Sequence, residues 1–150
     1  MIEGVGEAVI ACEPEAVVAF VTDLHRYKLA DHKIGRVFEC RQDGERFFMR
    51  HDGRLRGVPG PAVSLEMVVE GRWSVRYRGV PTFPSSAILR FDGGFAMTPA
   101  GDGLTRVVHT ERFHFFWPWR LVAEPFLRAW LTNDVGEEMV RFKTLLEASA

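Results

Sequence analysis

The hydrophobic and polar positions of the chain change their spacing twice. Residues 2–12 contain apolar anchors at strand-like spacing and predict a first β-strand. Pro14 then suits the first turn of a helix, and apolar side chains follow it at helical spacing as far as Leu24. Residues 23–31 predict a second, short helix. The chain therefore opens with a strand and two helices.

From residue 36 onward, the spacing has a period of two. It predicts six strands, over residues 36–42, 45–56, 62–70, 72–79, 85–98 and 103–116. The links between these strands are short and rich in glycine and proline. Because consecutive strands with short links pair antiparallel, we expect a meander.

The last segment returns to helical spacing. Pro125 can start a helix that runs to Ala148, which is about 36 Å at 1.5 Å per residue. One stripe of this helix is apolar and consists of Leu127, Leu131, Val135, Met139, Phe142 and Leu146. The helix is the only large element that could cover the apolar face of the sheet. We therefore predict an α+β fold of the order β-α-α-β6-α, in which a seven-stranded, curved antiparallel sheet wraps around a long C-terminal helix.

Composition and charge exclude several classes of function. At 150 residues the chain is expected to form a single domain over residues 1–150. Its 19 basic and 20 acidic side chains give a net charge of −1, which argues against a nucleic-acid partner, because phosphate binding needs a basic surplus. No stretch approaches the roughly 20 apolar residues of a transmembrane segment, and no signal peptide is visible. Cys12 and Cys40 have no metal or redox spacing, and two free thiols fit a cytoplasmic protein.

Motifs for cofactors and metals fail their required context. Gly4-Val5-Gly6 lacks the third glycine of a dinucleotide fingerprint and precedes a strand instead of a helix. The chain has no phosphate-binding loop and no His-Glu-x-x-His pair. His109 and His114 point to opposite faces of one strand and cannot ligate one metal ion. We expect neither a cofactor nor a metal.

Four segments carry a family resemblance. They are residues 9–17 with Phe20-Val21-Thr22-Asp23, the six-strand meander, residues 103–113, and the helix ending in residues 139–147. In this combination the chain resembles the START/polyketide-cyclase-like superfamily, also called SRPBCC. The resemblance implies a helix-grip fold with an apolar ligand pocket between the sheet and the C-terminal helix. Many members end the first helical pair with an aspartate, a turn and a Trp; here Asp23-Leu24-His25-Arg26-Tyr27 has no Trp, and Tyr27 is the candidate for its packing role.

Strand parity predicts which side chains face the pocket. On residues 103–116, the more apolar face carries His109, Glu111 and Phe113. A buried carboxylate without a partner is costly, so Glu111 needs His109, His51, a water or a ligand. The pair is either a satisfied internal contact, a polar anchor for a ligand, or a general acid/base pair.

The same parity rule extends the expected pocket to other strands. It turns Met49 and His51 inward on one strand and Trp73 and Tyr77 inward on another, with Glu and Arg pairing across the outer face. The expected ligand-binding residues are Tyr27, Met49, His51, Met67, Trp73, Tyr77, Phe83, Phe113, Trp117, Phe126 and Trp130.

Two features leave alternatives open. Loops 57–61, 79–84 and 116–119 fall at one end of a meander and are rich in proline and aromatic residues. They are either the entrance of a pocket or ordinary turns whose Trp side chains fill the core. Gly136 lies inside the last helix, where it leaves room either for a ligand or for a close strand.

Three hypotheses of function follow. The first is a protein that binds a hydrophobic small molecule of lipid, polyketide or isoprenoid type. The second is a cofactor-independent cyclase or dehydratase that uses His109 and Glu111 as acid and base. The third is a protein- or membrane-interaction module that uses residues 115–119. The fold does not choose among them, so enzyme activity stays open, as does a homodimeric state.

Overall fold

The computed structural model describes residues 1–149. Its elements are β1 (Ile2–Ile10), α1 (Pro14–Val21), α2 (Leu24–Tyr27), β2 (Ile34–Asp43), β3 (Arg46–Leu55), β4 (Val58–Glu70), β5 (Ser74–Val80), the short 3-10 helix η1 (Ser85–Ala87), β6 (Leu89–Gly101), β7 (Leu104–Phe115) and α3 (Trp119–Ala148). This order confirms the predicted α+β class and the β-α-α-β6-α sequence of elements.

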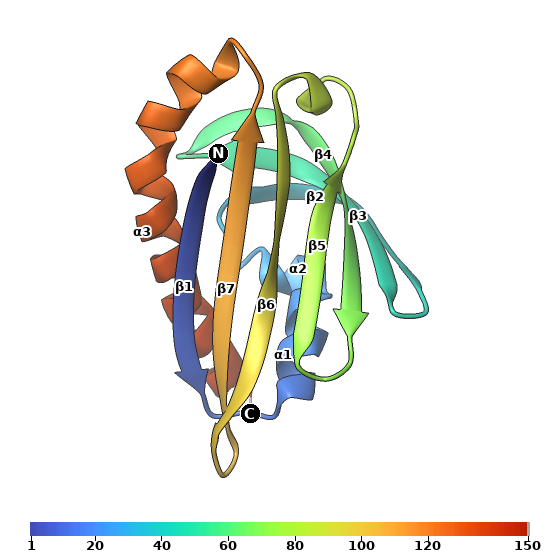
Figure 1. Cartoon of the computed structure of the whole chain (residues 1–150). Coiled ribbons are helices and arrows are strands. Elements are labelled where there is room, and N and C mark those ends of the chain that lie inside the picture. The colour runs from blue at the N-terminus through green and yellow to red at the C-terminus, as the bar shows by residue number, and fades with distance from the viewer. Residues whose placement is uncertain (150) are drawn as a thin grey trace.

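All seven strands form one antiparallel sheet in the order β1-β7-β6-β5-β4-β3-β2. The segment from β2 to β7 is the predicted meander, and β1 joins its far edge by pairing with β7. Figure 1 shows α3 running along β1, with α1 and α2 at the lower end of the curved sheet. Rings from these helices and from the sheet, Phe20, Tyr27, Phe95 and Phe142, pack together and fill that end.

Two glycines let α3 lie directly on β1. A Cβ atom at Gly6 would be 2.6 Å from the carbonyl oxygen of Val135, and one at Gly4 would be 2.9 Å from that of Leu131. No L-residue with a side chain fits that close to backbone. The Gly4-Val5-Gly6 run therefore serves helix–strand packing.

The last helix begins earlier than predicted. It starts at Trp119, and Pro125 lies inside it instead of at its first turn. Backbone bonds from Arg120 to Phe116 and from Leu121 to Pro118 start the helix. Proline at 125 removes the donor that would bond the carbonyl of Leu121, but Leu121 is exposed, so water can replace that donor.

Other boundaries also differ from the prediction. The second helix, predicted over residues 23–31, is only Leu24–Tyr27. Residues 85–87 form η1 instead of strand, and β4 begins at Val58, so the β3–β4 connection is a two-residue turn. That turn, Arg56-Gly57, has φ of 53° and 76°, as this type of hairpin turn requires. Trp73 lies in the turn before β5.

Neither expectation for Gly136 is correct. A Cβ atom at this position would meet no heavy atom within 4 Å, so no strand lies close to the glycine, and Gly136 does not line the cavity described below.

Candidate functional site

A cavity of about 410 Å³ lies between the concave face of the sheet and α3. This volume is within the usual range for a small-molecule site. Its wall is mostly aliphatic and aromatic, with Leu24, Leu65, Phe91, Phe113 and Leu127 among the lining residues. The predicted inward faces of β3, β4 and β7 do face the interior, since Met49, Met67 and Phe113 are buried.

The cavity opens beside the first turns of α3, which lie at the upper end of the molecule in Figure 1. Val58, Trp119, Val122 and Phe126 line it and are also exposed to solvent, so they mark its mouth. They come from the β3–β4 hairpin and from the first turns of α3. Ser85 and Ile88 of the β5–β6 connection and Leu89 at the start of β6 also line the cavity. Of the three predicted loops, residues 57–61 and 116–119 supply lining residues at the opening, and residues 79–84 supply none.

One contact joins the two sides of the mouth. The guanidinium of Arg56 lies over the ring of Phe126, 4.5 Å from its centroid, and its Nη1 donates to the Phe126 carbonyl at 3.4 Å. Arg56 is in the β3–β4 turn and Phe126 is in α3, so the hairpin closes against the helix. Figure 1 shows this hairpin reaching toward the upper half of α3.

The inner end of the cavity is built around Lys33. Its Nζ donates to Oδ2 of Asp134 and to Oε2 of Glu138, both at 2.8 Å. It also lies 2.9 Å from Oδ1 of Asp31 and 3.1 Å from Oε2 of Glu111. Together these five residues form what we call the lysine cluster, which joins the α2–β2 link, β7 and α3.

The lysine cluster has more acceptors than one ammonium can serve. An ammonium carries three protons, and four carboxylates surround it. Among residues 1–149, Oε2 of Glu111 receives no hydrogen bond although it is buried. Burial raises the pKa of Glu111 to about 7, even though the charge of Lys33 opposes the shift. Glu111 also lines the cavity, so its carboxyl group can exchange a hydrogen bond with a ligand.

His109 is held behind the cavity wall. It is only 1% exposed, and its ring stacks on Phe95 at 4.2 Å between centroids. Its Nδ1 lies 3.1 Å from Oε1 of Glu138, and its Nε2 lies 3.0 Å from the hydroxyl of Tyr77. Because a carboxylate can only accept, the neutral ring carries its proton on Nδ1 and accepts from Tyr77 at Nε2. Tyr77 lines the cavity and His109 does not.

Glu138 supplies a negative charge that contacts both Lys33 and His109. Its side chain is fully buried and also accepts a hydrogen bond from the hydroxyl of Tyr27. Burial disfavours its charge, but Lys33 and His109 outweigh that effect and hold its pKa well below the usual value. Burial lowers the pKa of Lys33 and of His109, but the surrounding carboxylates reverse both shifts and raise each pKa above its usual value. Burial raises the pKa of Tyr27 and of Tyr77 well above 10.

His51, on β3, contributes a hydrogen-bond acceptor. Its Nδ1 lies 2.8 Å from the carbonyl oxygen of Asp52, which can only accept, so the Nδ1 carries a proton. Burial lowers the pKa of His51, so its neutral form is favoured. The Nε2 atom of this ring is therefore a hydrogen-bond acceptor. His51 lines the cavity, which places this acceptor in its wall.

The residues expected from sequence to bind a ligand fall into two groups. Those that line the cavity are Tyr27, His51, Met67, Tyr77, Phe113 and Phe126, together with the predicted acid/base residue Glu111. Those that do not are Met49, which is in the main core, Trp73, which packs against that core from a turn, Trp130, which packs against the core under α3, and the exposed Phe83 and Trp117. His109 belongs with this second group, because it lies behind the cavity wall and does not line the cavity.

Four cluster residues, Asp31, Lys33, Asp134 and Glu138, were not predicted from sequence. Helical periodicity places Glu138 next to the buried stripe, three residues after Val135 and four before Phe142, but it does not show the ammonium that the carboxylate meets. Asp31 and Lys33 lie in a link with no periodic pattern. Asp31, Asp134 and Glu138 are close enough to one another to hold a metal ion, but the ammonium of Lys33 contacts all three and supplies the positive charge there.

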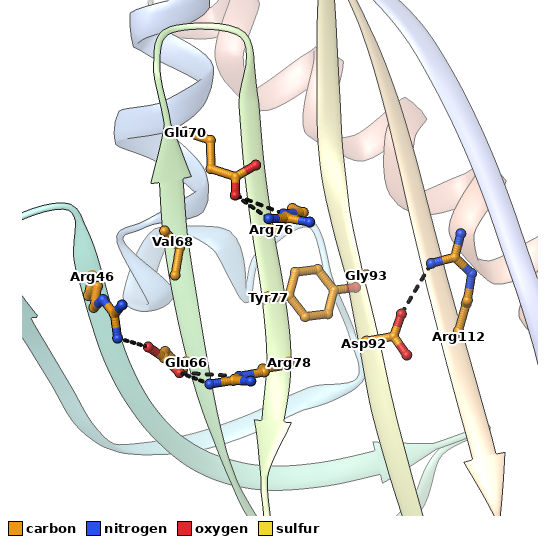
Figure 2. A pocket seen from close by; sticks show the side chains of 10 residues that line it. All are labelled: Arg46, Glu66, Val68, Glu70, Arg76, Tyr77, Arg78, Asp92, Gly93 and Arg112. Atoms are coloured by element: carbon orange, nitrogen blue, oxygen red, sulfur yellow. Dashed lines mark hydrogen bonds and ion pairs between the residues drawn. The ribbon is translucent and has the colours of Figure 1, made fainter.

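A second hollow of about 410 Å³ lies on the outer face of the sheet, and its charged side chains pair with one another (Figure 2). Glu66 bridges Arg46 and Arg78, both at 3.0 Å, and Asp92 pairs with Arg112 at 3.1 Å. The predicted cross-strand pairing on this face is therefore present. The lining holds four arginines and three acids, and each of the three acids pairs with an arginine.

Comparisons with known proteins agree with this architecture. The family model described as polyketide cyclase / dehydrase and lipid transport matches residues 1–147. Comparison with curated proteins gives no match. No helix among residues 1–149 is long and apolar enough to cross a membrane.

Solved structures share the fold at low sequence identity. The protein TTHA0849 of Thermus thermophilus is 19% identical with a TM-score of 0.76, and 99% of each chain is covered. The Zhui aromatase/cyclase of Streptomyces sp. R1128 is 13% identical with a TM-score of 0.72, covering 98% of this chain and 92% of that one. A START superfamily protein of Mycobacterium smegmatis is also 13% identical with a TM-score of 0.66, covering 98% and 95%. The SRPBCC resemblance and the helix-grip fold are confirmed, and the chain belongs to the polyketide cyclase / dehydrase and lipid transport family.

Proposed function

We propose that this protein binds an apolar small molecule that carries a polar group at one end. The observation that carries the proposal is the division of the cavity wall. Aliphatic and aromatic side chains line most of it, and the polar side chains of Lys33, Glu111 and Tyr77 gather at its inner end. A small molecule that is apolar over most of its length and polar at one end fits such a site.

The polar groups indicate the chemistry of the ligand's inner end. Oε2 of Glu111 and Nε2 of His51 can each accept a hydrogen bond, and neither receives one from residues 1–149, although the Lys33 ammonium lies 3.1 Å from the Glu111 oxygen. A ligand hydroxyl would satisfy either acceptor, whereas a second carboxylate would add negative charge to the lysine cluster. Lipids, polyketides and isoprenoids with a hydroxyl or phenol group fit this requirement.

Proton transfer is the second candidate function, and the pKa of Glu111 favours it. A carboxyl group with a pKa of about 7 can both give and take a proton at neutral pH. In this cofactor-independent cyclase or dehydratase, Glu111 is the acid/base group in contact with the ligand. Tyr77 lies beside it, and His109 acts only through Tyr77. The name of the Zhui aromatase/cyclase, a structural neighbour, agrees with such chemistry.

Binding can be tested with a long-chain alcohol and the alkane of equal length. Native mass spectrometry of the intact protein should show one bound alcohol and weaker binding of the alkane. Glu111→Leu and His51→Leu should each reduce the preference for the alcohol. Binding of neither compound would refute the proposal, and equal binding of both to the unaltered protein would refute a polar inner end. A proton-transfer role would be refuted if Glu111→Gln left solvent deuterium exchange into a bound ketone unchanged.

A further inference from the structure

The mouth of the cavity is surrounded by side chains that a water-facing surface seldom carries together. Phe83 is 83% exposed and Trp117 is 79% exposed, and neither lines the cavity. Leu121, Val122 and Phe126 are exposed on the first turns of α3. A patch of this kind, gathered at one end of the molecule, indicates an interaction surface.

The same segments carry a surplus of positive charge, since the acid on the first turns of α3, Glu124, pairs with the N-terminal amine and with Arg128. Residues 53–63, 79–91 and 113–123 contain Arg54, Arg56, Arg90 and Arg120, and no Asp or Glu. None of these four arginines forms an ion pair within residues 1–149, unlike the arginines of the outer face. The mouth therefore carries four arginines without an ion pair within residues 1–149, in a chain whose net charge is −1.

Two of these arginines lie against the exposed aromatic side chains. The guanidinium of Arg90 is 5.6 Å from the ring centroid of Phe116, and that of Arg56 lies over Phe126. Aromatic rings beside arginines at the edge of an apolar patch suit the boundary between lipid headgroups and acyl chains. We call the three segments the mouth surface.

We propose that the mouth surface docks on an anionic lipid bilayer, so that the cavity opens directly into the membrane. A bilayer accepts rings that protrude from separate loops without a matching pocket for each, which a protein partner would need. A bilayer also continues the apolar wall of the cavity, whereas a second protein would leave the opening unfilled. Docking does not require a ligand in the cavity, so an experiment can refute membrane docking without refuting ligand binding.

Vesicle sedimentation tests the proposal. The protein should sediment with vesicles of phosphatidylcholine and phosphatidylglycerol, and far less with vesicles of phosphatidylcholine alone. Raising the salt concentration should release it. Phe83→Ser/Trp117→Ser and Arg90→Ser/Arg120→Ser should each weaken binding by roughly tenfold or more, because each removes interfacial rings or surface charge.

Matched controls distinguish vesicle binding through the mouth surface from nonspecific vesicle binding. Arg36→Ser/Arg50→Ser removes two arginines that contact Phe38 and form no ion pair within residues 1–149. Val140→Ser removes an apolar side chain that is exposed elsewhere on α3. Both controls should bind vesicles like the unaltered protein. Absence of vesicle binding, equal loss in the controls, or a dimer in light scattering that Phe83→Ser/Trp117→Ser disperses would each overturn the proposal.

Discussion

The hydroxyl of Tyr77 lies 3.0 Å from Nε2 of His109, and this contact determines which of the two residues can reach a ligand. Tyr77 is in the cavity wall and His109 is behind it. The contact depends on Gly93, which pairs with Tyr77 across the β5–β6 ladder. A Cβ atom at Gly93 would be 2.5 Å from the Tyr77 hydroxyl, so only glycine leaves room for the ring.

Replacing Tyr77 by Phe should destabilise the protein although the ring is kept. The change removes the hydrogen-bond partner of Nε2 of His109, which is almost fully buried. An unsatisfied buried polar atom costs about 1 to 3 kcal/mol. Urea denaturation would measure the loss. Stability equal to that of the unaltered protein would show that the hydrogen bond does not contribute.

Replacing Lys33 by Met should have a larger effect. It leaves Asp31, Glu111, Asp134 and Glu138 without their shared cation, and breaking a buried ion pair in this way typically costs about 3 to 5 kcal/mol. Adding Glu138→Gln to Lys33→Met should recover part of the loss, because it removes one of the unpaired charges. Lys28→Met is the matched control, since Lys28 forms no ion pair within residues 1–149 and should tolerate the change. A double variant less stable than Lys33→Met would contradict this account of the cluster.

Glu111 should make stability depend on pH. Its pKa is about 7 in the folded protein, against an ordinary value of 4.5, so the folded state holds this proton more tightly than the unfolded chain. The stability it contributes is complete below 4.5 and is lost as the pH rises through about 7, by at most about 3 kcal/mol. Glu111→Gln cannot titrate, so between pH 5 and pH 8 it should lose less stability than the unaltered protein. Parallel curves in urea denaturation would show that the Glu111 carboxyl titrates normally.

Alanine substitutions at Gly6 and at Gly136 should change the stability of the protein in opposite directions. Gly6→Ala would place its Cβ atom 2.6 Å from the Val135 carbonyl oxygen and should cost about 1 to 3 kcal/mol by pushing α3 off β1. Gly136→Ala meets nothing within 4 Å and should stabilise α3 by up to about 1 kcal/mol. Thermal unfolding of both variants would check the pair. A stabilising Gly6→Ala would contradict the close packing of helix and strand.

Periodicity was sufficient to predict the fold because most strands bury only one face. Alternation identified the inward set of β7, including Glu111 and Phe113, and the structure has both facing inward. The start of α3 was missed because Pro125 suits a first helical turn, and the turns before it are held by backbone bonds that leave no pattern in the sequence. Lys33 was missed because a link between elements has no period from which to infer burial.

The site was harder to predict than the fold, since it depends on contacts between distant segments. Sequence parity paired His109 with Glu111, but the structure brings His109 to Glu138, on α3, and to Tyr77, on β5. A helix carboxylate beside apolar neighbours has the same pattern whether it faces water or an ammonium. Only the packing of α3 against the sheet distinguishes the two.

The most direct test of the central claim is a titration with the neutral fluorescent probe N-phenylnaphthylamine. Ala123 lines the cavity at its mouth, and Ala129 is exposed on the same helix and does not line it. If the cavity binds apolar molecules, Ala129→Trp should bind the probe with the affinity of the unaltered protein, and Ala123→Trp should bind it about tenfold more weakly or worse, a loss of about 1.4 kcal/mol or more. Equal affinity in the two variants would contradict ligand binding in this cavity.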